Sequence, residues 1–203
     1  MSSKLSKLLR SPVVLAYAGL TDEELMAKIQ QGSLSAYEAL YNRYEVSVWN
    51  FMRVKISDEQ ARLDLAQDVF LKLFNSASLF KTDQAFRPWF WAMIRNVIID
   101  HFKRKDALSS SMIKEEIQDD QINENQLFND PTFDLLVQKN HSEAVENCFN
   151  HLTDSQKEVL SLQLFSGLSL QQIADQVKIK PGAVKSLLFR GKDSLMKCLE
   201  RCT

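Results

Sequence analysis

The chain has 203 residues with 45% hydrophobic content, and its 25 basic against 26 acidic side chains give a formal net charge of −1, which taken alone argues mildly against a nucleic-acid partner. Only five Gly and four Pro occur, which argues against a glycine-rich phosphate loop or a many-turned β sandwich. Three Cys do not make a disulfide framework, and the odd count is typical of a protein of the reducing cytoplasm.

The first segment, residues 1–20, is basic and contains a short apolar run at residues 13–18 that superficially resembles a secretory signal. The run is shorter than the roughly 7–15 residues that a signal core needs, and Pro12 lies at its edge. We therefore interpret residues 1–20 as an N-terminal extension and expect a cytoplasmic protein. No later segment approaches the roughly 18 apolar residues of a membrane span, so we expect no membrane insertion.

The next segment, residues 21–106, predicts a bundle of three or four helices. Apolar side chains recur with the spacing of one helix face within residues 37–44, 66–74 and 90–98. No convincing strand pattern with turn chemistry occurs in the chain, so the fold class is predicted to be all-α. Trp89 shares an apolar helix face with its neighbours and is expected to pack in the core.

The periodicity ends after residue 106. Residues 106–140 carry two basic and eight acidic side chains, a net charge of −6. Such a composition cannot bury enough apolar surface to fold alone, so residues 107–130 are predicted to be an acidic flexible linker. Asp130 and Pro131 suit the cap and the first position of a new helix, and they predict where the second domain, residues 131–203, begins.

The second domain predicts a helix-turn-helix. Thr153 and Ser169 each start a capping-box pattern, and Gly167 is expected to end the helix between them. Pro181 suits the first turn of a further helix. One face of that helix is apolar, and it is formed by Val184, Leu188, Gly191, Leu195 and Cys198.

A polar and basic stripe lies largely off that apolar face. It is formed by Lys185, Ser186, Phe189 and Arg190. On a helix-turn-helix such a stripe would enter the major groove of DNA, where its side chains would contact phosphates and base edges. An ordinary helical hairpin with solvated Lys and Arg is the structural alternative.

The net charge of the whole chain results from cancellation. Residues 87–105 carry +4 and residues 178–203 carry +5, whereas the acidic segment between them carries −6. The near-neutral total therefore does not exclude a nucleic-acid partner.

These motifs resemble the sigma-70 family of bacterial RNA polymerase subunits. Residues 167–174 (GLSLQQIA) and 182–186 (GAVKS) are similar to its promoter-reading domain. Four further motifs occur in the order that the family uses in its first domain, and they are residues 22–27 (DEELMA), 36–44 (AYEALYNRY), 64–70 (DLAQDVF) and 86–100 (FRPWFWAMIRNVIID). The length points to the two-domain extracytoplasmic-function (ECF) group, and the resemblance covers residues 21–105 and 131–200.

The resemblance implies binding residues for three surfaces. Core polymerase, through the coiled coil of its β′ subunit, would be bound by Asp64, Gln67 and Asp68. The −10 promoter element would be opened and read by Arg95, Asn96, Lys103 and Arg104, with Asn96 beside a flipped base. The −35 element would be read by Lys185, Ser186, Phe189 and Arg190.

The resemblance also implies which partners to expect. They are core RNA polymerase (the β′ coiled coil and the β subunit), promoter DNA and an anti-sigma factor. Neither a catalytic role nor a cofactor, a metal or a small-molecule substrate is expected, since catalysis belongs to the polymerase.

Three positions depart from the family pattern. Leu63 stands where relatives often have Glu in the polymerase-binding helix, Lys178 takes the usual Gly of the turn, and Leu187 replaces a frequent Arg on the reading helix. The first change would reshape the polymerase contact, the second would alter the turn geometry, and the third removes a phosphate contact.

Three alternatives from other classes remain open at this stage. The first is a helix-turn-helix activator whose N-terminal domain senses a ligand or a partner. The second is a zinc-binding regulator that uses Cys148, His151, Cys198 and Cys202, although this spacing is not that of a standard zinc knuckle. The third, an enzyme, is the weakest, because no nucleophile pattern lies near any His and no phosphate loop or HExxH motif occurs.

Overall fold

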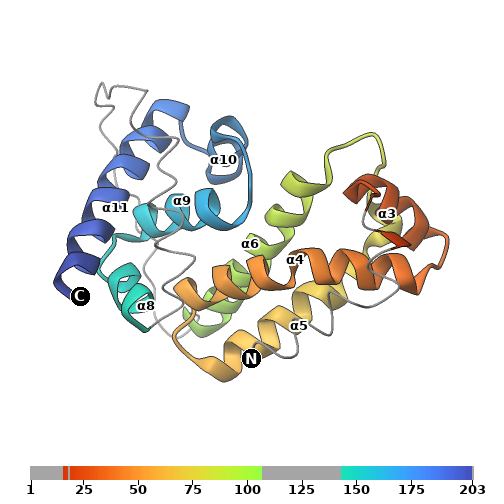
Figure 1. Ribbon diagram of the computed structural model, residues 1–203, viewed down its shortest axis with the longest axis horizontal. Helices are drawn as coiled ribbons and strands as arrows, with labels where there is room; N and C mark the ends of the chain where they lie inside the picture. Colours follow the sequence, from red (N-terminus) through yellow and green to blue (C-terminus); the bar gives the residue numbers. More distant parts are fainter. Residues whose placement is uncertain (1–15, 18, 107–142, 203) are drawn as a thin grey trace. The chain divides into compact units, whose positions relative to one another are not determined.

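The computed structural model describes residues 16–17, 19–106 and 143–202, and these residues form helices and short connections without any strand (Figure 1). The all-α prediction is confirmed for this part of the chain, and no helix in it is long and apolar enough to cross a membrane. The predicted linker at 107–130, its restart at Asp130 and most of the N-terminal extension lie outside the described residues. The chain divides into two compact units, residues 1–49 with 58–105 and residues 50–57 with 106–203.

The first unit contains the predicted bundle. Its helices are α3 (Asp22–Gln30), α4 (Leu34–Lys55) up to residue 49, α5 (Glu59–Asn75), the 3-10 turn η1 (Ala77–Leu79) and α6 (Phe86–Asp106) up to residue 105. Thr21 begins α3 with a capping box, because its hydroxyl accepts from the Glu24 N–H while the Glu24 carboxylate accepts from the Thr21 N–H. Asp58 caps α5 in the same local manner by accepting from the Ala61 N–H at 2.7 Å.

Aromatic rings join the three long helices of this unit. Phe86 and Phe90 of α6 stack with centroids 5.2 Å apart, and the Phe90 ring meets Tyr44 of α4 edge-on at 5.2 Å. Phe70 of α5 lies 6.1 Å from Phe90. Trp89 is half-buried with its ring 5.9 Å from that of Phe86, so it lies at the edge of the core and not within it, where its helix face predicts it to lie. Phe90 is fully buried. This cluster fixes the start of α6 on α4 and α5.

Two polar side chains of α3 form hydrogen bonds to the backbone of η1 and of the start of α6. Glu23 Oε1 accepts a 2.8 Å hydrogen bond from the backbone N–H of Phe86, the first residue of α6. Gln30 Nε2 donates to the carbonyl oxygens of Ala77 and Phe80, at 3.0 and 2.7 Å. The position of α6 is therefore set by directional contacts as well as by ring packing.

The second unit contains the predicted helix-turn-helix. Its complete helices are α8 (Glu143–Asn150), α9 (Asp154–Phe165), α10 (Leu170–Val177) and α11 (Pro181–Cys202). Both predicted capping boxes are present, at Thr153 for α9 and at Ser169 for α10. Gly167, with φ of 65°, follows α9 in the left-handed conformation that the sequence pattern predicts for it.

Helix α11 contacts α8, α9 and α10, and its most extensive contact is with α9. A Cβ placed on Gly191 would lie 3.6 Å from both Gln156 Cβ and Leu160 Cδ2, which are ordinary van der Waals distances, so Gly191 of α11 lies directly against α9. The core is apolar, and its buried members include Val159, Leu160, Ile173, Ala174, Val184, Leu188, Leu195 and Leu199.

The turn between α10 and α11 contains Lys178 in a left-handed conformation, with φ of 59° and ψ of 41°. Its N–H donates to the Ala174 carbonyl, and the N–H of Ile179 donates to the same oxygen at 3.2 Å. The turn thus has the geometry that Gly would adopt without strain, and Lys occupies it at an energetic cost.

A disulfide joins Cys148 of α8 to Cys198 of α11, with Cα atoms 5.6 Å apart. The number of cysteines does not predict this pairing, since three Cys do not indicate a disulfide framework. The disulfide also argues against the zinc alternative, because two of its four ligands are bonded to each other. A pairing across 50 residues depends on the packing of α8 on α11, which residue spacing does not reveal.

Candidate functional surfaces

Helix α5 exposes the polar face that the sequence predicts. Asp64, Gln67 and Asp68 are all exposed, whereas the opposite face of the helix is buried in the unit through Leu65, Val69, Phe70 and Leu73. Leu63, the departure from the family pattern, is 41% exposed. The face therefore presents carboxylates and an amide beside an exposed apolar side chain.

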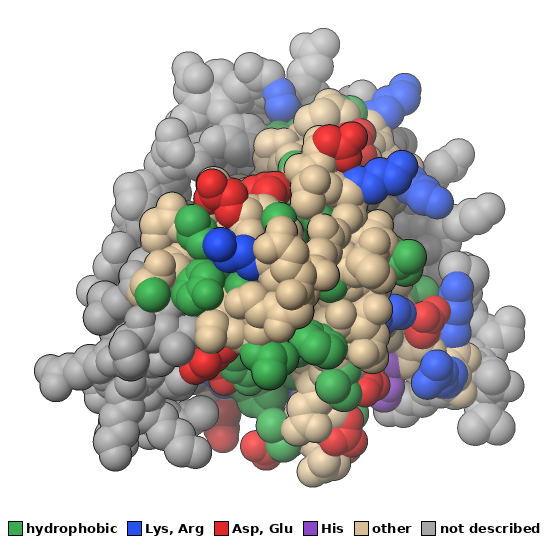
Figure 2. Space-filling model, turned by 90° about the vertical axis from the view of Figure 1, so that its right-hand side faces the viewer, with side chains coloured by type: hydrophobic (Ala, Val, Ile, Leu, Met, Phe, Trp, Pro, Cys, Tyr) green, Lys and Arg blue, Asp and Glu red, His purple; other side chains and the backbone are tan. Residues whose placement is uncertain are grey.

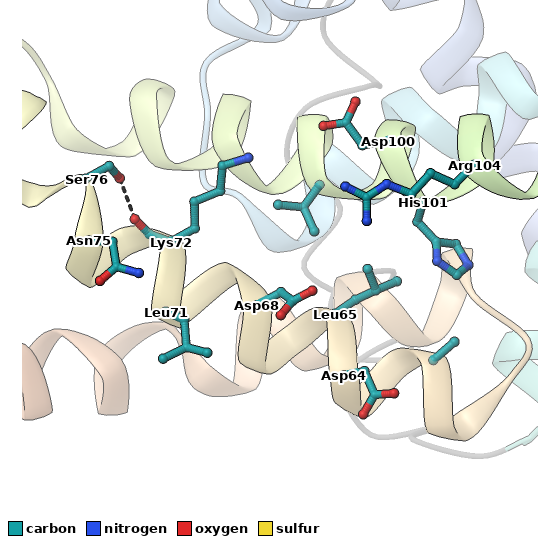
Figure 3. A pocket seen from close by; sticks show the side chains of 12 residues that line it. Asp64, Leu65, Asp68, Leu71, Lys72, Asn75, Ser76, Asp100, His101 and Arg104 are labelled. Atoms are coloured by element: carbon teal, nitrogen blue, oxygen red, sulfur yellow. Dashed lines mark hydrogen bonds between the residues drawn. The ribbon is translucent and has the colours of Figure 1, made fainter.

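A cleft of about 640 Å³ lies between α5 and α6 (Figure 3). We refer to it as the α5–α6 cleft. Lys72 extends from α5 towards α6, and Arg104 extends from α6 over the cleft. The residues that line it are Ala61, Asp64, Leu65, Asp68, Leu71, Lys72, Asn75, Ser76, Val97, Asp100, His101 and Arg104.

The structure separates Arg104 from the other three residues predicted to contact the −10 element. Arg104 lines the α5–α6 cleft with Asp64 and Asp68, which the resemblance implies for polymerase binding. Asn96 and Lys103 are exposed and Arg95 is half-buried, and these three residues do not line the cleft. One residue predicted to contact DNA, Arg104, therefore lies in the same cleft as two residues predicted to contact polymerase, Asp64 and Asp68.

The face of α6 that carries Asn96 also exposes two large apolar side chains. Ile99 is 36% exposed and Phe102 is 38% exposed, and both fall on the same half of the helix as Asn96 and Lys103. An exposed aromatic ring among basic side chains is the arrangement on which bases stack. Sequence reasoning missed Ile99 and Phe102, although their spacing from Asn96 on the helix could have indicated them.

The predicted −35 stripe of α11 is partly exposed. Phe189 is 46% exposed, Arg190 is exposed and Lys185 is half-buried. Ser186 is fully buried, so the expectation that it lies on the exposed stripe is wrong. The physical reason is that this turn of α11 is buried around most of its circumference, since Leu187 beside it is buried as well. The DNA contacts of the other three residues stay a prediction.

The surface in Figure 2 shows how charge is distributed on one face of the molecule. Acidic and basic side chains are interspersed there, and several hydrophobic side chains reach the surface between them. This face is therefore not a uniformly basic surface. The charged residues on individual helices, and not the net charge of the chain, indicate where a partner could bind.

Two family models match the chain, one in each unit. The model of sigma-70 region 2 matches residues 40–107, and that of sigma-70 region 4 matches residues 142–195. The first match contains the polar face of α5 and all of α6. The second contains α8 to α10 and most of α11.

Two relatives align over most of their length. The chain is 25% identical over 165 residues to the ECF RNA polymerase sigma factor SigX of Bacillus subtilis (strain 168), which covers 81% of this chain and 84% of SigX. It is 24% identical over 181 residues to the RNA polymerase sigma-H factor of Pseudomonas aeruginosa (strain PAO1), which covers 88% and 94% of the two chains.

Two solved structures share the fold. CnrH, solved in complex with the cytosolic domain of CnrY, has a TM-score of 0.61 at 20% identity and covers 90% of this chain and 99% of its own. The sigma factor RpoE, solved in complex with the anti-sigma factor NepR from Bartonella quintana, has a TM-score of 0.58 at 18% identity and covers 79% and 94%.

Proposed function

Because the chain belongs to the sigma-70 family, as an RNA polymerase sigma factor of the ECF type, we propose how its two units divide the work of promoter recognition. The unit with α5 and α6 docks on core polymerase and melts the −10 element, and the unit with α9 to α11 reads the −35 duplex. Residues 107–130 act as the linker between domains at 21–106 and 131–203, in a cytoplasmic protein.

The observation that supports this division is the polar face of α5. Asp64, Gln67 and Asp68 are exposed on a helix whose other side is fixed in the core, so they are free to meet a partner without unfolding the unit. We assign them to the β′ coiled coil, and we expect the β subunit to contact the chain as well.

On α6, the exposed Asn96 and Lys103 with Arg95 suit the capture of a single strand, because base stacking and phosphate attraction add. On α11, Lys185, Phe189 and Arg190 suit the major groove. The buried Ser186 is left out of this set.

We also propose that an anti-sigma factor controls the chain by covering its polymerase-facing surface. RpoE was solved with the anti-sigma factor NepR, and CnrH was solved with the cytosolic domain of CnrY. Bond making belongs to the polymerase in this proposal, so the chain itself contributes no catalytic group.

The test is whether the purified chain binds core polymerase in the absence of DNA. We expect the two to co-elute in size-exclusion chromatography, and the Asp64→Ala/Asp68→Ala double variant to bind at least about tenfold more weakly, a change of about 1.4 kcal/mol. Asp175→Ala is the matched control, because Asp175 is an exposed carboxylate of α10 outside this surface.

Failure of the wild-type chain to bind core polymerase would contradict the proposal. Tight binding to duplex DNA without polymerase would then favour the helix-turn-helix activator. If the chain binds core polymerase, sequencing of transcripts after its induced expression identifies the promoters it reads.

A further inference from the structure

Helix α6 presents two chemically different faces, and only one of them suits DNA. Asn96 and Lys103 lie on one face, whereas Val97, Asp100, His101 and Arg104 share the face that lines the α5–α6 cleft. The spacing of i, i+3, i+4 and i+7 from Val97 to Arg104 is that of a single helix face. Arg104 and Lys103 are therefore neighbours in sequence but point in different directions.

We propose that the α5–α6 cleft binds a protein segment of core polymerase, with Asp100, His101 and Arg104 as contact residues, so that Arg104 serves polymerase binding and not DNA binding. This inference rests on the proposed function and extends its polymerase-binding surface from α5 to α6.

The charge of the cleft favours a protein segment over a phosphate backbone as its occupant. Three carboxylates line it, those of Asp64, Asp68 and Asp100, against the two cations of Lys72 and Arg104. All these side chains line one cleft, and charges closer together than about 8 Å are not fully screened at physiological salt. A polyanion would meet net repulsion there, whereas a protein segment with both basic and acidic side chains would find complementary partners.

The charged groups of the cleft are available to such a partner. Among the residues that the structure describes, the side chains of Asp68, Asp100, Lys72 and Arg104 make no ion pair or hydrogen bond with one another or with other described side chains. A partner would therefore form new charge-assisted contacts with them.

The floor of the cleft is apolar and suits the same kind of partner. Leu65 and Val97 are buried at its base, and Leu71 is 58% exposed at its side. A volume of about 640 Å³ accommodates several side chains. The occupant that fits is an amphipathic helix that presents an apolar side chain to this floor, a basic one to Asp64 and Asp68, and an acidic one to Lys72 and Arg104.

The position of the cleft supports this choice of partner. Asp64 and Asp68 belong both to the cleft and to the polar face of α5 that we assign to the β′ coiled coil. One helical segment lying along α5 would therefore reach α6 without a second binding event.

The experiment compares Arg104→Ala with Lys103→Ala, two adjacent exposed cations on different faces. Affinity for core polymerase is measured without DNA by fluorescence anisotropy. Affinity of the assembled holoenzyme for a fluorescent single-stranded oligonucleotide is measured over a range of salt concentrations.

We expect Arg104→Ala to weaken core binding by about fivefold or more, as truncation of an interfacial charge does, and to leave the salt dependence of DNA binding unchanged. Lys103→Ala should leave core affinity within about twofold and reduce the slope of log K against log salt by about 0.7, the value for one phosphate contact on a single strand. Asp100→Asn, in the same cleft, should behave like Arg104→Ala.

The opposite pattern, in which Arg104→Ala reduces the salt slope and keeps wild-type core affinity, would overturn the inference while the proposed function stands. Failure of the wild-type chain itself to bind core polymerase would instead overturn the proposed function. Thermal melts of each variant confirm that the helices remain folded.

Discussion

The hydroxyl of Tyr44 in α4 donates a hydrogen bond to Oδ2 of Asp22, the first residue of α3. Arg43 Nη1 lies 2.5 Å from the other oxygen of the same carboxylate, and Arg87 Nε, one residue into α6, lies 3.7 Å from Oδ2. Asp22 is 8% exposed, so these groups replace the water that burial removes. One carboxylate thus joins α3, α4 and α6 at the end where α6 begins.

Replacement of Asp22 by Ala should lower the free energy of unfolding by about 2–3 kcal/mol. The reason is that Tyr44 and Arg43 lose a charged acceptor in a site with little access to water. Urea denaturation followed by circular dichroism measures the change. Asp68→Ala is the control, because Asp68 is exposed and a surface substitution there should change stability by less than about 0.5 kcal/mol. Equal effects of the two substitutions would contradict this interpretation of the network.

The stability of the first unit should fall above pH 10. Burial raises the pKa of Tyr44 above its ordinary value of 10.0, and the hydrogen bond to Asp22 and the charge of Asp22 raise it further. The folded state therefore holds the phenolic proton more tightly than the unfolded state, so this contribution is complete below pH 10 and is lost as the pH rises above that value.

The Tyr44→Phe variant should show a shallower loss of stability on the alkaline side than the wild type. Burial also raises the pKa of Tyr37 and Tyr41, and these two residues should account for the slope that remains. Denaturant titrations at several pH values on either side of 10 measure it, and identical slopes for variant and wild type would show that Tyr44 does not titrate in this way.

The helices of both units could be predicted from the sequence because their signals are local. A capping box such as that at Thr153 satisfies backbone groups within one turn, and the helical spacing of apolar residues sets which face is buried. The polar face of α5 was predicted correctly for the same reason, since exposure of Asp64 and Asp68 follows from the burial of Val69 and Leu73 on the other side.

The structural features that could not be predicted from the sequence depend on contacts between residues that are far apart in the chain. Helical spacing placed Ser186 opposite the apolar face of α11, but it could not show that the residues around it, such as Ala183 and Leu187, are buried as well. It likewise could not place Arg104 in a cleft, because that requires knowing which side of α6 lies against α5. The pairing of Cys148 with Cys198 required the packing of α8 on α11.

Replacement of Lys178 by Gly should stabilise the second unit by about 1 kcal/mol, because a left-handed residue with a side chain costs about that much relative to Gly. Lys178→Ala is the matched control, since it removes the charge and keeps a Cβ at φ of 59°. Urea denaturation measures both variants. Stabilisation by Ala equal to that by Gly would indicate that charge, and not backbone strain, is relieved.

Reduction of the disulfide between Cys148 and Cys198 should lower the stability of the second unit by up to about 4 kcal/mol. A cross-link that spans 50 residues removes chain entropy from the unfolded state on this scale. Urea denaturation with and without a dithiol reductant measures the loss. A Cys198→Ala variant should be as unstable as the reduced protein and should not respond to reductant.

Removal of either basic side chain of the α11 stripe, Lys185 or Arg190, should weaken binding to the −35 duplex if the proposed assignment holds. If they contact bases, Lys185→Ala and Arg190→Ala should each cost about 1–3 kcal/mol. Transcription in vitro from a promoter identified by transcript sequencing measures the loss, with Lys197→Ala, near the other end of α11 and paired with Asp193 at 2.7 Å, as the control. Wild-type transcription by both variants would show that the stripe on α11 is assigned wrongly.

The bond between Cys148 and Cys198 also changes the topology of the chain. Residues 148–198 form a closed covalent ring that contains α9, the whole helix-turn-helix and most of α11. A protease that cuts once in this ring, for example at the exposed Gly167, opens it without releasing a fragment. Nicked protein should therefore migrate as one species in denaturing gels without reductant and as two with it, so a single cut does not by itself detach α11 from the rest of the molecule.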